Sequence, residues 1–261
     1  MLIVCIGDSI TEGLGVIRTK SSYADLIKKQ FQEVYSIPVN VLNFGASAMQ
    51  INESLEKYSE KIISLQPDIV IIAHGITESI VREQKKYLRY LPKRWRRPGW
   101  MDPRAYYSRS KLRRFMEKTE SSIRWRTKVA LIKIFGGLPW MNISDFENYS
   151  NDFVSKILTN SPSTNIIFLS PSDVDQKYFP GSSDSMSKYR EVTKKICELN
   201  SSTCRVFMCD SHHVLDKWTD YFEDHFHPNE HGHKKIANML VHTIKENDLF
   251  QKKLIRNEVS I

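Results

Sequence analysis

The chain has 261 residues, which is enough for one large domain or two small ones with a sizeable core. Its 41% hydrophobic and 26% charged residues are typical of a soluble globular protein, and they exclude wholesale disorder and fibrous repeats. The net charge of +8 is unevenly spread, because residues 82–135 hold 18 Lys/Arg and four Asp/Glu. That segment carries +14 and the rest of the chain −6, which indicates a local anionic ligand rather than a chain that is basic throughout.

The start of the sequence gives an expectation about the compartment. Residues 2–6 are a strand-like apolar run that ends at Gly7, without the basic region and longer apolar core of a signal peptide. No apolar run is long enough to span a bilayer, so we expect a cytoplasmic protein. The cysteines lack CxxC spacing, and we expect reduced, buried thiols at Cys5, Cys197, Cys204 and Cys209.

Strand-like and helix-like segments alternate along the chain. Buried-strand patterns cover residues 2–6, 39–44, 67–75, 165–171 and 204–210, and apolar residues at helical spacing cover 21–36, 52–65, 144–159, 184–199 and 230–246. This alternation predicts an α/β fold with an open, doubly wound, five-stranded parallel sheet. In such sheets the functional residues gather in loops after the carboxyl ends of the strands.

Three motifs lie in such loops. In GDSITEG, Ser9 follows the first strand, where a serine can project its hydroxyl from a tight turn; turn and helix-cap chemistry is the simpler alternative. In NFGASA, Gly45 permits close backbone approach, although a plain loop glycine fits equally well. In EDHFHPNEHGH, Asp224 and His227 are three residues apart, so one loop supplies a base and the carboxylate that orients it.

Together these motifs resemble the SGNH (GDSL-type) hydrolase superfamily. The resemblance rests on the GDSI block, the Asn43–Gly45 block and the Asp224–His227 block followed by Pro-Asn, and it runs from residue 2 to about residue 245. It implies a flavodoxin-like three-layer α/β/α fold, which we interpret as a single domain over 1–261 that contains the basic insert 82–135.

The resemblance also implies the roles of individual residues. Ser9 would be the nucleophile, His227 the base that takes its proton, and Asp224 the residue that orients His227. The oxyanion would be held by the N–H groups of Ser9 and Gly45 and by a side-chain donor. Flanking residues are expected to line the substrate site: Asp8, Asn43 and His74.

One block departs from the family pattern. After the third strand the family shows G-x-N-D, in which the Asn amide completes the oxyanion hole, whereas this chain has Gly75-Ile76-Thr77-Glu78. Thr77 could supply a hydroxyl donor in its place, or His74 could contribute, or the hole could be weaker by one donor. Loss of one oxyanion donor costs on the order of 10²–10³ in rate.

The remaining histidines do not indicate a metal site. His225, His227, His231 and His233 lie within nine residues, but neither a cysteine nor a second carboxylate pair joins them at a familiar spacing. We therefore expect no metal and no bound cofactor. His212 and His213 follow the last strand, where packing is the first interpretation and a place at the pocket rim the second.

The basic insert alternates arginines with aromatic residues and begins after the third predicted strand. Prolines and a glycine make its first half loop-like, and Leu112, Phe115, Met116, Thr119 and Ile123 predict a helix packed by its apolar face in the second half. Arg94, Arg96 and Arg97 are the expected contacts for a polyanion: an acidic glycan, the phosphates of an acyl-coenzyme A, or an anionic membrane surface. A solvated basic face is the alternative, and no nucleic acid is expected.

Two reactions fit an acyl-Ser9 intermediate. Transfer to water would make the protein an esterase or deacetylase, and transfer to a sugar hydroxyl would make it an O-acyltransferase with acetyl-CoA as co-substrate. Because large basic inserts resemble those of bacterial surface-polysaccharide enzymes, we favour O-acetyl transfer to a surface or capsular glycan, with the esterase next. A non-catalytic polyanion-binding module is the third possibility.

Overall fold

The structure is a computed structural model that describes residues 1–16, 21–96 and 109–249. Its centre is a five-stranded parallel sheet with the strand order β2-β1-β3-β6-β7. The strands are β1 (Leu2–Gly7), β2 (Asn40–Asn43), β3 (Ile69–Ala73), β6 (Asn165–Leu169) and β7 (Val206–Cys209). Each lies inside or within one residue of a predicted strand, so the predicted sheet is confirmed.

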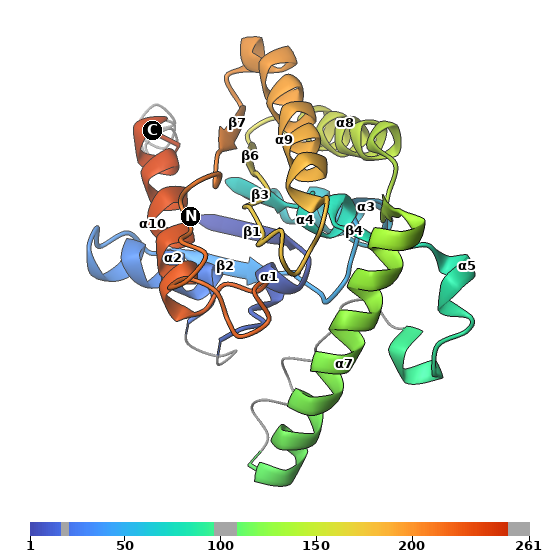
Figure 1. The fold of residues 1–261 in the computed structure, drawn as a ribbon. Helices are drawn as coiled ribbons and strands as arrows, with labels where there is room; N and C mark the ends of the chain where they lie inside the picture. Colours follow the sequence, from blue (N-terminus) through green and yellow to red (C-terminus); the bar gives the residue numbers. More distant parts are fainter. Residues whose placement is uncertain (17–20, 97–108, 250–261) are drawn as a thin grey trace, which may run out of the picture.

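Helices cover both faces of the sheet (Figure 1). One layer holds α2 (Tyr23–Glu33) and α10 (Glu230–Glu246); the other holds α3 (Ile51–Leu65), α8 (Ile143–Asn160) and α9 (Ser182–Leu199). Alternate residues of β1 explain the two layers, because Ile3 and Cys5 enter the core under the first layer and Val4 and Ile6 the core under the second. The expected flavodoxin-like α/β/α architecture is confirmed.

Two of the short helices that were not predicted lie at the edge of the main sheet. They are α1 (Ser9–Glu12) after β1 and α4 (Ile76–Ser79) after β3, and each has a single turn, too short for helical periodicity to show. Both begin at the carboxyl end of a central strand. They therefore carry the residues that the sequence motifs singled out.

The basic insert is closed at its base by a small antiparallel ladder. Strand β4 (Val81–Glu83) pairs with β5 (Gly137–Pro139), so the chain leaves and re-enters the body at one place. Between them lie α5 (Lys85–Leu88), the 3-10 turn η1 (Lys93–Arg96) and the long helix α7 (Lys111–Phe135). A further 3-10 turn, η2 (Ser201–Thr203), joins α9 to β7.

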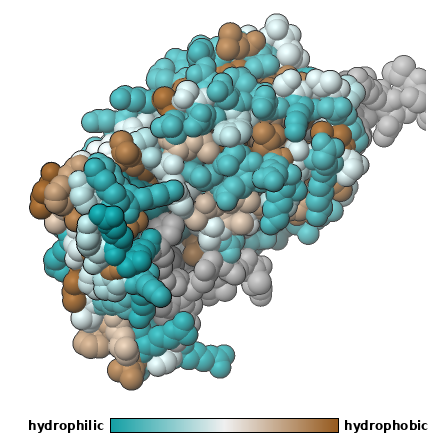
Figure 2. All heavy atoms as spheres, turned by 90° about the vertical axis from the view of Figure 1, so that its right-hand side faces the viewer, coloured by the Kyte–Doolittle hydropathy of each residue, from teal (hydrophilic) through white to brown (hydrophobic). Residues whose placement is uncertain are grey.

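Helix α7 forms where it was predicted, but it packs by the opposite face. Leu112, Phe115, Met116 and Ile123 are exposed, and the buried residues are Glu117, Ser121, Arg124 and Lys128. Ion pairs to other elements explain the reversal: Glu117 lies 3.0 Å from Arg94 of η1, and Lys128 lies 2.7 Å from Glu83 of β4. In the space-filling view hydrophobic side chains accordingly appear at the surface of the lobe at the lower left, which α7 forms (Figure 2).

Two smaller expectations can be compared with the structure. All four cysteines are free thiols; Cys5, Cys197 and Cys209 are buried as expected, but Cys204 is exposed in the turn before β7. Within the described residues, no helix combines the length and apolar character that crossing a membrane requires.

Candidate active site

Ser9 stands at the first position of α1, directly after the central strand β1. Asp8 caps this helix, because its Oδ1 accepts a hydrogen bond from the N–H of Ile10 at 2.9 Å. Gly13 ends it after one turn with a φ of 87°, a left-handed conformation that favours glycine. The tight turn holds the Ser9 side chain, 6% exposed, at the carboxyl edge of the sheet.

The structure brings Ser9, His227 and Asp224 together into one hydrogen-bonded chain. His227 Nε2 lies 2.8 Å from Ser9 Oγ, and His227 Nδ1 lies 2.5 Å from Asp224 Oδ2. The other carboxylate oxygen of Asp224 accepts the N–H groups of Phe226 at 3.1 Å and of His227 at 3.0 Å. The carboxylate is thus fixed by its own loop, and it fixes the imidazole tautomer that presents an unprotonated Nε2 to the serine.

Charge at the site favours proton acceptance by His227. Burial by itself would lower the pKa of this imidazole, but the charge of Asp224 and its hydrogen bond outweigh burial and raise the pKa above the ordinary value of 6.5. A raised pKa makes Nε2 a stronger base toward the Ser9 hydroxyl. The Phe226 ring lies edge-on to the imidazole, with 4.9 Å between centroids, and limits its movement.

The basic insert contacts the loop that carries Asp224 and His227. Trp125 of α7 packs against Tyr178, with 4.9 Å between the ring centroids, and Tyr178 stacks on His225 at 3.9 Å. Lys118 of the same helix lies 3.0 Å from Glu223. The insert therefore borders the site, as expected from its exit point after β3.

Gly45 lies against the nucleophile helix. A Cβ at this position would come within 2.3 Å of the Glu12 nitrogen and 2.5 Å of the Thr11 carbonyl carbon, so only glycine fits. The N–H of Gly45 donates to Asn43 Oδ1 at 2.9 Å, and Asn43 Nδ2 donates to the carbonyl of Thr11 at 2.6 Å. Asn43 thus braces the glycine loop against α1, and its expected place at the substrate stays a prediction.

Thr77 and Asp8 are bonded to each other. The Thr77 hydroxyl donates to Asp8 Oδ2 at 2.5 Å, and both side chains are buried. Burial raises the pKa of Asp8, and the hydrogen bonds from Thr77 and Ile10 offset part of that rise. Asp8 is therefore buried, with both carboxylate oxygens hydrogen-bonded within the protein, and the Thr77 hydroxyl is directed at Asp8. The roles expected of Asp8 at the substrate and of Thr77 in the oxyanion hole stay predictions.

Glu78 is a supporting residue that the sequence analysis missed. Its fully buried carboxylate accepts the N–H of Ile51 at 2.7 Å and the N–H of Gly75 at 2.8 Å. His74 Nδ1 lies 3.3 Å from it, and His74 Nε2 bonds Ser54 Oγ at 2.7 Å. Burial would raise the pKa of Glu78, but His74 and the N–H of Gly75 outweigh it and lower the pKa. His74, expected at the substrate, is thus buried beneath the site.

The arginines expected to bind a polyanion are engaged within the insert. Arg94 Nη1 lies 2.7 Å from Glu120 and its Nη2 3.0 Å from Glu117. Arg96 donates to the carbonyl oxygens of Leu91 at 2.9 Å and Arg89 at 2.8 Å. Arg97 lies outside the described residues. Arg94 and Arg96 therefore hold the insert together, and a role for the three in substrate binding stays a prediction.

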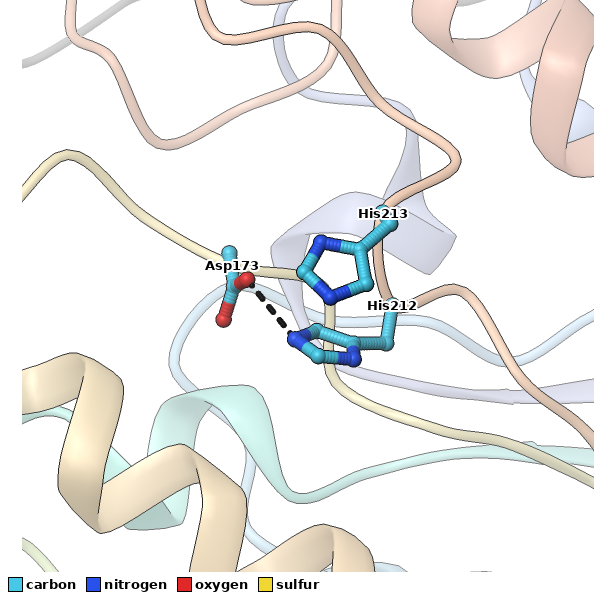
Figure 3. A group of neighbouring side chains, drawn as sticks. All are labelled: Asp173, His212 and His213. Atoms are coloured by element: carbon cyan, nitrogen blue, oxygen red, sulfur yellow. Dashed lines mark ion pairs between the residues drawn. The ribbon is translucent and has the colours of Figure 1, made fainter.

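A second cluster lies at the carboxyl ends of β6 and β7 (Figure 3). The donor atoms of Asp173, His212 and His213 lie within 4.8 Å of one another and would suit a divalent cation, a grouping the sequence analysis did not foresee. However, His212 Nε2 lies 3.0 Å from one oxygen of Asp173 and Arg190 lies 3.1 Å from the other. These contacts already balance the carboxylate charge, so we describe the group as an ion-pair cluster.

Of the neighbouring histidines, His233 is fully buried and accepts a hydrogen bond at Nδ1 from the backbone of Tyr23. Burial lowers the pKa of His233 to about 4. It therefore acts as a neutral packing residue behind the His227 loop.

Solved structures share this fold at low sequence identity. A lipase/acylhydrolase from Enterococcus faecalis aligns with a TM-score of 0.60 at 15% identity, covering 94% of this chain and 95% of that one. A family 3 carbohydrate esterase from Clostridium thermocellum gives 0.58 at 16%, covering 94% and 95%. An acetylxylan esterase from Geobacillus stearothermophilus gives 0.57 at 19%, covering 93% of each chain.

Comparison with curated protein sequences gives no match. The model of the GDSL-like lipase/acylhydrolase family, in contrast, matches residues 5–235, a span that contains Ser9, Asp224 and His227. Because this match covers most of the chain, from the second half of β1 to α10, and includes both ends of the hydrogen-bonded chain, the protein belongs to the GDSL-like lipase/acylhydrolase family.

Proposed function

We propose that this protein is a serine esterase that removes acyl groups from carbohydrate hydroxyls through an acyl-Ser9 intermediate. The observation that carries the proposal is the hydrogen-bonded chain from Ser9 through His227 to Asp224 at the carboxyl edge of the sheet. Nucleophile, base and orienting carboxylate stand in the order that acyl transfer requires.

The reaction follows from this geometry. Ser9 Oγ attacks the ester carbonyl carbon while its proton passes to His227 Nε2, and Asp224 stabilises the imidazolium. The Ser9 N–H, at the first position of α1, has no acceptor within its helix and can donate to the oxyanion. Collapse breaks the carbonyl carbon–alkoxy oxygen bond, and His227 returns the proton to the leaving alcohol. Water then attacks the acyl-serine by the same route.

The acceptor in this proposal is water. The case for acetyl-CoA rested on cationic side chains that could hold its phosphates, and Arg94 and Arg96 are engaged inside the insert. Two of the structural neighbours, named above as a carbohydrate esterase and an acetylxylan esterase, support a sugar ester as the substrate class. O-acetyl transfer from acetyl-CoA to a glycan is the second candidate, because the +14 insert borders the catalytic loop.

The test is acetate release from an O-acetylated oligosaccharide, measured for the wild-type protein and for Ser9→Ala. We expect release by the wild type and at least about a thousandfold less by Ser9→Ala, because removal of a triad member leaves only residual catalysis. Hydrolysis of 4-nitrophenyl acetate without any release from acetylated sugars would contradict the carbohydrate assignment.

A parallel reaction separates the two acceptors. The protein is incubated with acetyl-CoA and the deacetylated oligosaccharide, and the products are identified by mass. Hydrolysis predicts free acetate from the sugar ester and no acetylated oligosaccharide from acetyl-CoA. Formation of acetylated oligosaccharide faster than free acetate would reverse the assignment in favour of the transferase.

A further inference from the structure

Helix α7 turns its apolar side away from the protein. Its buried residues, Glu117, Ser121, Arg124 and Lys128, recur every three or four positions and so form one polar face. The apolar face of α7 lies on the opposite side and consists of Leu112, Phe115, Met116, Ile123 and Ile134, which are between 51% and 71% exposed. Along the helix axis this stripe is about 33 Å long.

Charge decides what can cover this face. Residues 111–135 hold eight Lys/Arg and two Asp/Glu, a net charge of +6. Both acidic residues are on the polar face or beside it: Glu117 and Glu120 each pair with Arg94 and Arg124. Exposed cations remain along the helix, at Lys111, Arg113, Arg114, Arg126 and Lys133. The apolar stripe is thus flanked by positive charge with no exposed carboxylate on the helix.

A second copy of the chain does not suit this face. A two-fold contact would lay the same patch on itself, so that two helices of charge +6 would face each other without an acidic partner. An anionic lipid surface suits it better, because acyl chains accept the apolar residues and phosphate headgroups accept the flanking Lys and Arg. The N-terminal half of α7 also projects beyond the body, where a flat surface can reach it (Figure 1).

We propose that the apolar face of α7 docks on the surface of an anionic lipid bilayer. The helix lies along the interface with its polar face still packed on the protein, and does not cross the bilayer. Lys118 of α7 pairs with Glu223 in the loop that carries His227, and Trp125 packs on Tyr178, which stacks on His225. Docking therefore places the catalytic edge next to the lipid headgroups. The proposal holds whichever acyl acceptor Ser9 serves.

The experiment is co-sedimentation of the full chain with vesicles of phosphatidylcholine, with or without about one-third phosphatidylglycerol. We expect binding to the anionic vesicles that weakens as salt is raised, and little binding to the neutral ones. Substituting Leu112, Phe115 and Ile123 together with Gln should lower the partition coefficient at least about tenfold.

A matched control variant replaces hydrophobic side chains that are equally exposed but lie outside α7. Val34, Leu199 and Trp218 are 67–72% exposed and lie on other elements, so their joint substitution with Gln should leave vesicle binding unchanged. Circular dichroism checks that both triple variants fold. Failure of the wild type to bind, or equal loss in both variants, would overturn the proposal. A dimer of the wild type in sedimentation velocity would also overturn it if the α7 variant is monomeric and the control variant still dimerises, because the face would then bind a second copy.

Discussion

His227 illustrates how one neighbour sets the chemistry of a residue. Its pKa is raised above 6.5 by Asp224 against the effect of burial, and catalysis needs the neutral imidazole. Activity should therefore fall as pH drops through this raised pKa, so the acidic limb of the kcat/KM profile should have its midpoint above 6.5.

Asp224→Asn tests that cause. Without the carboxylate, burial still lowers the pKa of His227 and only the charges of Asp8 and Glu12 still raise it, so the midpoint should move to lower pH. The kcat should fall by about 10⁴ because the imidazole tautomer is no longer fixed. Glu223→Gln, one residue earlier and outside the hydrogen-bonded chain, is the control. A midpoint that stays in place in Asp224→Asn would show that Asp224 does not raise the pKa.

The substitution Thr77→Val tests whether Thr77 supports Asp8 or donates to the oxyanion. Its hydroxyl donates to buried Asp8, so Thr77→Val should leave one carboxylate oxygen without that donor and lower the free energy of unfolding by about 1–3 kcal/mol. Loss of an oxyanion donor would instead lower kcat by about 10²–10³. We expect the stability loss in urea denaturation and a kcat loss below tenfold; the reverse pattern would restore Thr77 to the oxyanion hole.

At the scale of elements, the Gly45 loop and α1 must touch. Gly45→Ala would place a methyl group 2.3 Å from the Glu12 nitrogen, and backbone atoms cannot rotate away. We expect a loss of about 1–3 kcal/mol in unfolding free energy together with lower activity, because α1 carries Ser9. Ser47→Ala in the same loop removes an exposed hydrogen bond to Glu12 of α1 without a backbone clash, and should cost less than about 1.5 kcal/mol. Wild-type stability in Gly45→Ala would mean that the loop is not packed on α1.

Helix α7 is held to the body by charge, and this too can be measured. Lys128 of α7 is buried and lies 2.7 Å from Glu83 of β4, so Lys128→Met should destabilise the protein by about 3–5 kcal/mol. Lys29→Met breaks an exposed pair with Glu33 and should cost less than about 1 kcal/mol. Similar urea midpoints for both variants would show that the buried pair does not anchor α7.

For α7, the sequence predicts the position of the helix but not which of its faces is buried. Its position was predictable, because apolar residues recur at helical spacing from Leu112 to Ile123. Its buried side was not, because that depends on Glu83 and Arg94, partners far along the chain that pair with Lys128 and Glu117. Periodicity identifies an apolar face, but it does not say whether the protein or another surface covers it.

For the whole molecule, five strands and six long helices, α7 among them, were predicted because each has a continuous apolar or periodic pattern, and the resemblance to a known superfamily implied their three-layer arrangement. The sequence also indicated Ser9, Asp224 and His227, whose motifs are local. The hydrogen bonds that support the site were not predicted, because their partners are far apart in the sequence: Thr77 and Asp8 are separated by 69 positions, and Glu78 and Ile51 by 27. Residue type and spacing do not encode such pairings.

The central claim is that Ser9 is the nucleophile of an acyl-transfer site built on this sheet. The most direct measurement is labelling of the wild-type protein with a fluorophosphonate, followed by peptide mass spectrometry. Ser9 activated by His227 should carry the phosphonyl group, and Ser9→Ala should remain unlabelled under the same conditions. An unlabelled wild type, or a label on another residue that persists in Ser9→Ala, would contradict the claim.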